Sequence, residues 1–172
     1  MDPIESSELG GMRNVYLVGR LWFGAVPGVA DLELARRRGV TRVIDLCSPD
    51  EATEVDLASA CRSLGLEYLG GMIPVEELEG DDSVDLVLSW LGSPPDDGEE
   101  PWTLMYDGTG GRCAAYLAIH RVVGQGVELD EALVEARRAG MKPGLLEELV
   151  RAQVARLTST EEAPVSERAP AR

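Results

Sequence analysis

Short apolar runs alternate with amphipathic segments along most of the chain. Apolar runs rich in β-branched or aromatic residues are typical of strands, and apolar residues at helical spacing are typical of helices. Strands are expected over Asn14–Phe23 (a strand or a hairpin broken at Gly19), Thr41–Leu46, 66–69, 72–75 and Trp102–Tyr106. Helices are expected over 30–38, 51–64, 81–91, 112–123, 129–139 and 143–157. This alternation predicts an α/β fold with a mainly parallel central sheet flanked by helices.

The two ends of the chain differ from this pattern. Residues 1–12 are polar and contain glycine, so we expect them to form a flexible N-terminal arm. Residues 158–172 are rich in Pro, Ser and Glu and have few apolar side chains, which predicts a disordered C-terminal tail. Since domains average roughly 150 residues, residues 13–157 are expected to form a single domain.

The charge balance excludes several classes of partner. The chain has 16 Lys and Arg against 31 Asp and Glu, for a net charge of −15. A surface that binds nucleic acid needs an excess of basic residues, and anionic membranes require the same. We therefore expect neither nucleic acid nor a membrane as partner.

The cysteines point to a reducing compartment. Cys47, Cys61 and Cys113 are odd in number, widely spaced and without a CxxC pair, so a disulfide framework or a structural zinc site is not expected. The first residues lack the basic and apolar regions of a signal peptide, and no apolar stretch approaches the roughly 18 residues of a membrane span. The sequence therefore predicts a soluble cytoplasmic protein without metal or cofactor.

A glycine-rich turn between a strand and a helix carries the candidate chemistry. After the strand ending at Tyr106, the chain reads Asp107, Gly108, Thr109, Gly110, Gly111 and Arg112, and an apolar helix follows. Glycines let successive N–H groups point at one spot, and a helix N-terminus adds free N–H groups and partial positive charge there. Arg112 can add a planar fork that binds two oxygens of an oxyanion. The turn is predicted to bind an anion; alternatively, the glycines only permit a tight turn and Arg112 is solvated.

This region resembles the cysteine-dependent protein tyrosine and dual-specificity phosphatases. Their motif is His-Cys, five residues, Arg and Ser/Thr, between a strand and a helix, and it overlays Met105–Cys113. Upstream, Asn14–Gly24 resembles the opening strand pair of the family, and Gly39–Leu46 resembles its Gly-Val-x-x-Val-Ile-x-Leu strand. Ile73–Glu77 resembles the segment that carries the general acid. Over residues 13–157, the resemblance implies a single-domain protein-tyrosine-phosphatase-like fold.

The residues that would break bonds differ from the family pattern. The nucleophile position holds Tyr106, a phenol that is mostly protonated at pH 7. Met105 replaces the histidine, Cys113 replaces the Ser/Thr, and Glu77 stands at the general-acid position. In a second register, with one residue fewer in the loop, Asp107 takes the nucleophile position. Only Arg112 and the glycines match the functional pattern.

Three functions remain open on these grounds. The first is a pseudophosphatase that binds a phosphate- or sulfate-like anion, a phosphorylated ligand or a partner protein through Asp107–Arg112. The second is an active phosphatase that uses Asp107 or Cys113 as a non-standard nucleophile. The third is a structural interaction domain with an empty anion cradle. We favour the first.

Overall fold

A mixed sheet with the strand order β1-β2-β3-β6-β4-β5 forms the centre of the molecule. The computed structural model describes residues 2–48, 51, 55–70, 80–92 and 100–161. The strands are β1 (Glu5–Ser6), β2 (Tyr16–Val18), β3 (Leu21–Ala25), β4 (Val40–Asp45), β5 (Glu67–Leu69) and β6 (Trp102–Asp107). Strands β3, β6, β4 and β5 are parallel, whereas β1 and β2 extend the sheet in antiparallel pairing. The mainly parallel sheet predicted from the sequence is thereby confirmed.

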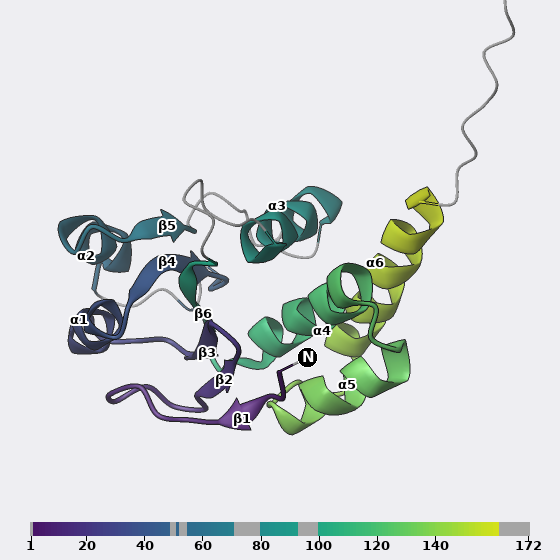
Figure 1. The fold of residues 1–172 in the computed structure, drawn as a ribbon, viewed down its shortest axis with the longest axis horizontal. Coiled ribbons are helices and arrows are strands. Elements are labelled where there is room, and N and C mark those ends of the chain that lie inside the picture. Colours follow the sequence, from purple (N-terminus) through teal and green to yellow (C-terminus); the bar gives the residue numbers. More distant parts are fainter. Residues whose placement is uncertain (1, 49–50, 52–54, 71–79, 93–99, 162–172) are drawn as a thin grey trace, which may run out of the picture.

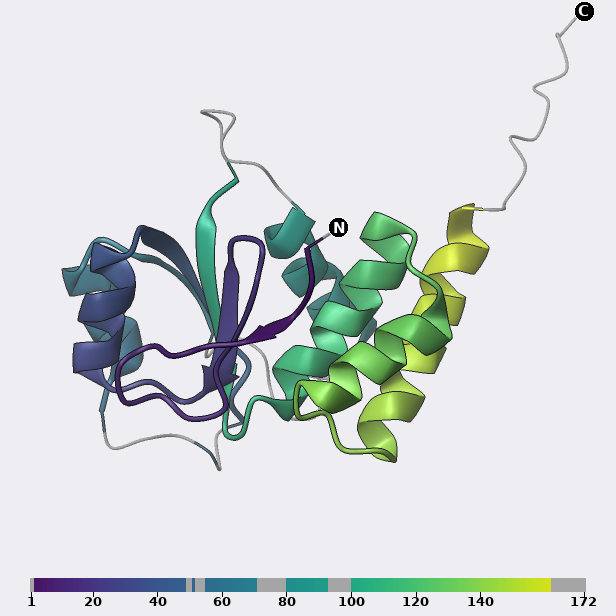
Figure 2. The same ribbon diagram turned by 60° about the horizontal axis from the view of Figure 1, so that its bottom comes forward.

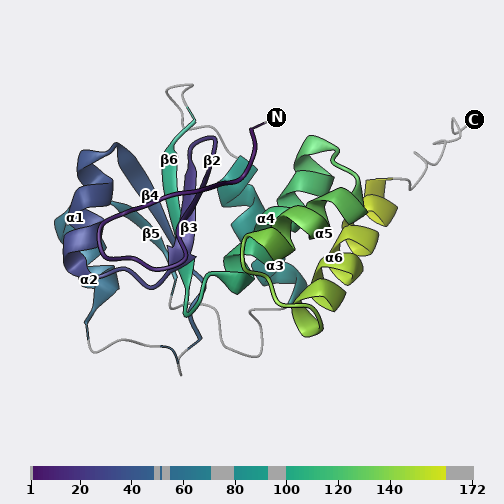
Figure 3. The same ribbon diagram turned by 90° about the horizontal axis from the view of Figure 1, so that it is seen from below.

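Helices cover both faces of this sheet (Figures 1 and 3). The helices are α1 (Val29–Arg37), α2 (Leu57–Ser63), α3 (Asp81–Gly92), α4 (Gly111–Gln125), α5 (Leu129–Arg138) and α6 (Leu145–Glu161). Helices α1 and α2 lie on one face; α3 and α4 lie on the other, with α5 and α6 packed outside α4. Each face has its own apolar core. Met105 packs into the core on the α4 side, whereas Leu104 and Tyr106 pack into the core on the α1 side.

The N-terminal segment is more ordered than its composition suggests. Residues 1–12 were expected to form a flexible arm, but Glu5–Ser6 pairs with β2 and Leu9 is completely buried. Strand pairing supplies backbone hydrogen bonds that the polar composition does not reveal. Figure 2 shows this segment crossing over the sheet edge.

Two helix boundaries differ from expectation by more than two residues. Helix α2 begins at Leu57 rather than at residue 51, because the carboxylate of Asp56 accepts the N–H of Ser59 and caps it there. Helix α6 continues to Glu161, past the expected end at residue 157. Hydroxyls of Thr158 and Ser159 bond carbonyls one turn back, which is compatible with a helix in this polar sequence. In the part of the chain that the structure describes, no helix is long and apolar enough to cross a membrane.

The parallel strands bring distant segments together at one edge. The carboxyl ends of β3, β6 and β4 are neighbours, with Ala25 paired to Asp107 and Asp45 paired to Tyr106. In open parallel sheets, ligands bind outside this edge. The segments that follow these strands are therefore where a functional site is expected.

Candidate functional site

The glycine-rich turn joins the end of β6 to the start of α4, as its sequence predicts. Gly110 adopts φ +91° directly before the helix, and a Cβ there would lie 3.2 Å from the Cα of Gly24 on β3. Both the backbone angle and the close approach to β3 require glycine at this position. The turn is thus held tightly against the neighbouring strand.

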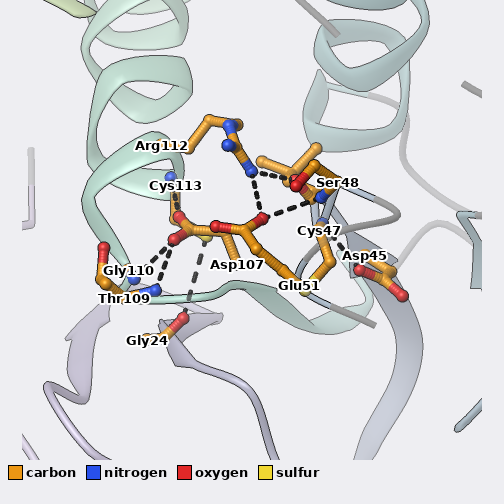
Figure 4. Close-up of polar contacts among 11 residues, drawn as sticks. Gly24, Asp45, Cys47, Ser48, Glu51, Asp107, Thr109, Gly110, Arg112 and Cys113 are labelled. Carbon is orange, nitrogen blue, oxygen red and sulfur yellow. Dashed lines mark hydrogen bonds and ion pairs between the residues drawn. The ribbon is translucent and has the colours of Figure 1, made fainter. Parts of the chain in front are cut away.

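The amides of this turn converge on a carboxylate of the chain itself (Figure 4). One oxygen of Asp107 accepts the N–H groups of Thr109 and Gly110, both at 2.8 Å, and the other accepts the N–H of Cys113 at 2.8 Å. Asp107 is only 2% exposed. The amides point inward as the sequence predicts, but the negative charge they bind is internal. It also caps the N-terminus of α4, where a negative charge is favourable.

Arg112 is also paired with a carboxylate of the chain. Its Nη1 donates to Glu51 Oε2 at 3.0 Å and to the carbonyl oxygen of Leu46. The same Glu51 oxygen accepts the N–H of Ser48 at 2.8 Å. Burial raises the pKa of Glu51, but the hydrogen bond from Ser48 and the contacts with Arg112 outweigh it, so its pKa is lowered. Glu51 therefore stays ionised on the guanidinium at neutral pH.

The side chain of Glu51 also lies against Gly108 of the turn. A Cβ at Gly108 would lie 2.5 Å from Glu51 Oε1, so a larger residue there would displace the end of this side chain. The side chains of Arg112 and Glu51 remain 21% and 29% exposed, so solvent reaches the pair. The sequence alone does not reveal Glu51 as a site residue, since it lies 61 residues from Arg112 and belongs to no recognised motif.

Tyr106 lies on the other face of β6. Successive strand residues point to opposite faces, and Tyr106 packs completely buried on the α1 side, while Asp107 faces the turn. The Tyr106 hydroxyl donates to Asp45 Oδ2 at 2.9 Å, and the Tyr68 hydroxyl donates to the same oxygen at 2.6 Å. Burial and the charge of Asp45 raise the pKa of Tyr106, so it stays a neutral phenol. The turn amides therefore surround the side chain of Asp107, as in the second register, and not that of Tyr106.

None of the three cysteines is placed as a reactive thiolate. All three are free thiols, and Cys61 and Cys113 are buried. Burial and then the Asp107 carboxylate raise the pKa of Cys113 well above its ordinary value. Burial, followed by the charge of Asp45, raises the pKa of Cys47, and burial raises that of Cys61 to about 11. A thiol in such surroundings is protonated at neutral pH and is a poor nucleophile.

Asn14 is a second residue that the sequence analysis did not connect to the turn. It has φ +52°, the left-handed region that asparagine tolerates better than most residues, and its side-chain amide donates to the carbonyl of Thr109 at 3.1 Å. The backbone carbonyl of Asn14 also lies beside Gly24, where a Cβ would approach it to 2.9 Å. Asn14, Gly24 and Gly110 thus form a close-packed support for the turn.

The remaining candidates lie elsewhere. Glu77, at the expected general-acid position, falls within 71–79, outside the described residues. His120 borders a cavity of about 660 Å³ at the opposite end of β3 and β6, together with Arg20, Thr103 and Trp90. Burial and then Arg121 lower the pKa of His120, which leaves it neutral at pH 7. The side chains that the structure describes include no cluster of three or more potential metal ligands.

Solved structures share this architecture. Tk-PTP in its active form superposes with a TM-score of 0.64 at 24% identity, over 80% of this chain and 93% of its own. TpbA from P. aeruginosa gives 0.64 at 21% identity, over 90% and 89% of the two chains. The core catalytic domain of the PP-IP phosphatase SIW14 from S. cerevisiae gives 0.58 at 15% identity, over 90% and 96%. No family model matches the sequence, and no curated protein matches it significantly. The chain has the fold of the cysteine-based protein-tyrosine-phosphatase-like phosphatases.

Proposed function

We propose that this chain is a phosphatase-like binding domain that lacks phosphatase turnover and takes an oxyanion at Arg112 in exchange for Glu51. The observation that carries the proposal is the pairing of two internal carboxylates with the turn. Asp107 occupies the amides, and Glu51 occupies the guanidinium. The site keeps the groups that bind an anion but lacks a thiolate to attack it.

The absence of turnover follows from the surroundings of each candidate nucleophile. The phenol of Tyr106 is buried on the face of β6 that carries α1, and Cys113 is a buried neutral thiol. Aspartate carboxylates form acyl-phosphates in other folds, which makes Asp107 a candidate nucleophile. Here, however, both of its oxygens accept backbone hydrogen bonds and the residue is 2% exposed, so neither is free for in-line attack.

Binding at Arg112 is supported by its exposure and by its present partner. The side chains of this ion pair are partly open to solvent, which weakens their attraction, so an external anion can compete with it. Structures of the same fold have been solved with phosphotyrosine bound to a Cys-to-Ser variant of TpbA and with citrate bound to SIW14. The three free thiols support the further expectation that the protein works in the reducing cytoplasm.

The test combines turnover and binding. The full chain should not hydrolyse p-nitrophenyl phosphate above the rate of Arg112→Gln. Calorimetric or NMR titration with phosphate, sulfate and acetate should give binding that Arg112→Gln abolishes and Glu51→Gln strengthens. Hydrolysis that requires Arg112, or a covalent phosphate mass on Asp107 or Cys113, would overturn the proposal. So would the absence of binding for every anion.

A pair of cysteine variants tests the register of the turn. In Asp107→Cys, the new sulfur should accept the amides of Thr109, Gly110 and Cys113, and its stabilised thiolate should be detectable by ultraviolet absorbance at neutral pH. In Tyr106→Cys, the buried sulfur should remain a neutral thiol at the same pH. The reverse pattern would place position 106 at the centre of the turn.

A further inference from the structure

The charge around Arg112 bears on which anions the site accepts, and the argument rests on the proposed function. Arg112 is the only basic side chain that the described contacts place at the turn. Two carboxylates, Asp107 and Glu51, lie next to it, and both add to the stabilisation of its charged form. The assembled site therefore already carries one negative charge in excess.

Three of the backbone donors at the turn are not free for a second anion. The N–H groups of Thr109, Gly110 and Cys113 all donate to Asp107. A tetrahedral dianion binds strongly where several amides and a guanidinium converge on it. Here it would meet the guanidinium with these three amides already engaged.

The carboxylate of Asp107 repels an anionic ligand, and this repulsion grows with the negative charge of the ligand. This carboxylate accepts three backbone hydrogen bonds and is almost completely buried, so water screens its field weakly. Exchange of Glu51 for a monovalent anion leaves the charge of the site unchanged. Exchange for a dianion adds one more negative charge beside Asp107.

The present occupant shows which ligand geometry the site fits. The planar carboxylate of Glu51 lies over Gly108 and accepts both Arg112 Nη1 at 3.0 Å and the N–H of Ser48 at 2.8 Å. A carboxylate from outside can accept the same two donors once Glu51 withdraws. We infer that the ligand of this site is a monovalent carboxylate, on a small acid or on an acidic peptide, and that phosphate dianions are disfavoured.

The experiment measures anion preference in the full chain with Glu51→Gln, which opens the guanidinium to ligands. Acetate, sulfate and inorganic phosphate are titrated at pH 7.5 and constant ionic strength, with NMR chemical shifts around Arg112 as readout. Acetate should bind at least tenfold more tightly than sulfate or phosphate. A short acidic peptide that binds more tightly than acetate would identify a peptide as the source of the carboxylate, and equal affinity would identify a small acid.

Asp107→Asn in the same background is the matched variant. It removes the charge and keeps one acceptor oxygen, so the preference for acetate over sulfate should shrink toward unity. Should this variant fail to fold, the order of affinities in Glu51→Gln alone decides the matter. Tighter binding of sulfate or phosphate than of acetate would overturn the carboxylate assignment while leaving anion binding intact. Binding of no anion at all would instead overturn the proposed function.

Discussion

Asp107 and Glu51 are two carboxylates bound to the same turn in different surroundings. Asp107 is 2% exposed and accepts three backbone N–H groups from residues two to six positions ahead. The side chain of Glu51 is 29% exposed and meets an arginine 61 residues away. Backbone donors are fixed by the fold, whereas an ion pair that solvent partly reaches can exchange partners. The comparison indicates that the amides bound to Asp107 stabilise the fold, whereas the guanidinium of Arg112 can exchange Glu51 for another anion.

Asp107→Ala should cause the largest loss of stability. It leaves three N–H groups without their acceptor at a buried position, and unsatisfied buried groups cost about 1–3 kcal/mol each where water cannot replace the partner. Allowing for partial access of water, we expect the free energy of unfolding to fall by about 3 kcal/mol in urea denaturation. Asp107→Asn, which keeps one acceptor, should lose less. A loss below about 1 kcal/mol for alanine would show that the amides do not depend on this carboxylate.

Asn14→Ala should rank second, since it affects the support of the turn rather than its centre. The substitution removes the hydrogen bond to Thr109. It also puts alanine at φ +52°, a left-handed conformation that alanine tolerates less well than asparagine. Each effect costs about 1 kcal/mol, so we expect a loss of about 2 kcal/mol. Asn14→Gly is the control, because glycine tolerates this φ and loses only the hydrogen bond. Equal losses for the two variants would mean that the backbone angle contributes nothing.

Tyr106→Phe should have a smaller effect, of about 1 kcal/mol. Asp45 loses one phenol but keeps the hydroxyl of Tyr68 and the N–H of Cys47. Because Tyr106 faces away from the turn, its variant should bind anions as the unmodified protein does. Tyr68→Phe is the matched control in the same cluster. Altered anion affinity in Tyr106→Phe alone would contradict the separation of the two faces.

Local patterns in the sequence are sufficient for the turn but not for its partners. Apolar runs and glycines predict the order of β6, turn and α4, because each depends on neighbouring residues. The spacing of the family motif, taken from Arg112, places Tyr106 at the nucleophile position. Side chains alternate between the two faces of β6, so Asp107 lies on the same face as Met105. That this face is the one that packs against α4 depends on tertiary structure, which the strand sequence does not show.

The contacts that give the site its character are long-range. Glu51 meets Arg112 across 61 residues, and Asn14 meets Thr109 across 95. In the sequence, Glu51 and Asn14 resemble ordinary polar surface residues. Their roles depend on the pairing of β3, β4 and β6, which a single sequence does not reveal. Likewise, the burial of Leu9 depends on β1 joining the sheet edge.

Glu51→Gln should change stability least, and only in a defined range of pH. The pKa of Glu51 is lowered in the folded protein from its ordinary 4.5, so the folded state favours the ionised form. This stabilisation is complete above the unfolded pKa and is lost as pH falls through the folded pKa. At pH 7, the unmodified protein should exceed Glu51→Gln by well under about 1 kcal/mol, as for other solvent-accessible pairs. Unfolding curves of both proteins should converge progressively below about pH 4.5. A difference that persists or grows in acid would show that Glu51 acts through packing over Gly108 and not through its charge on Arg112.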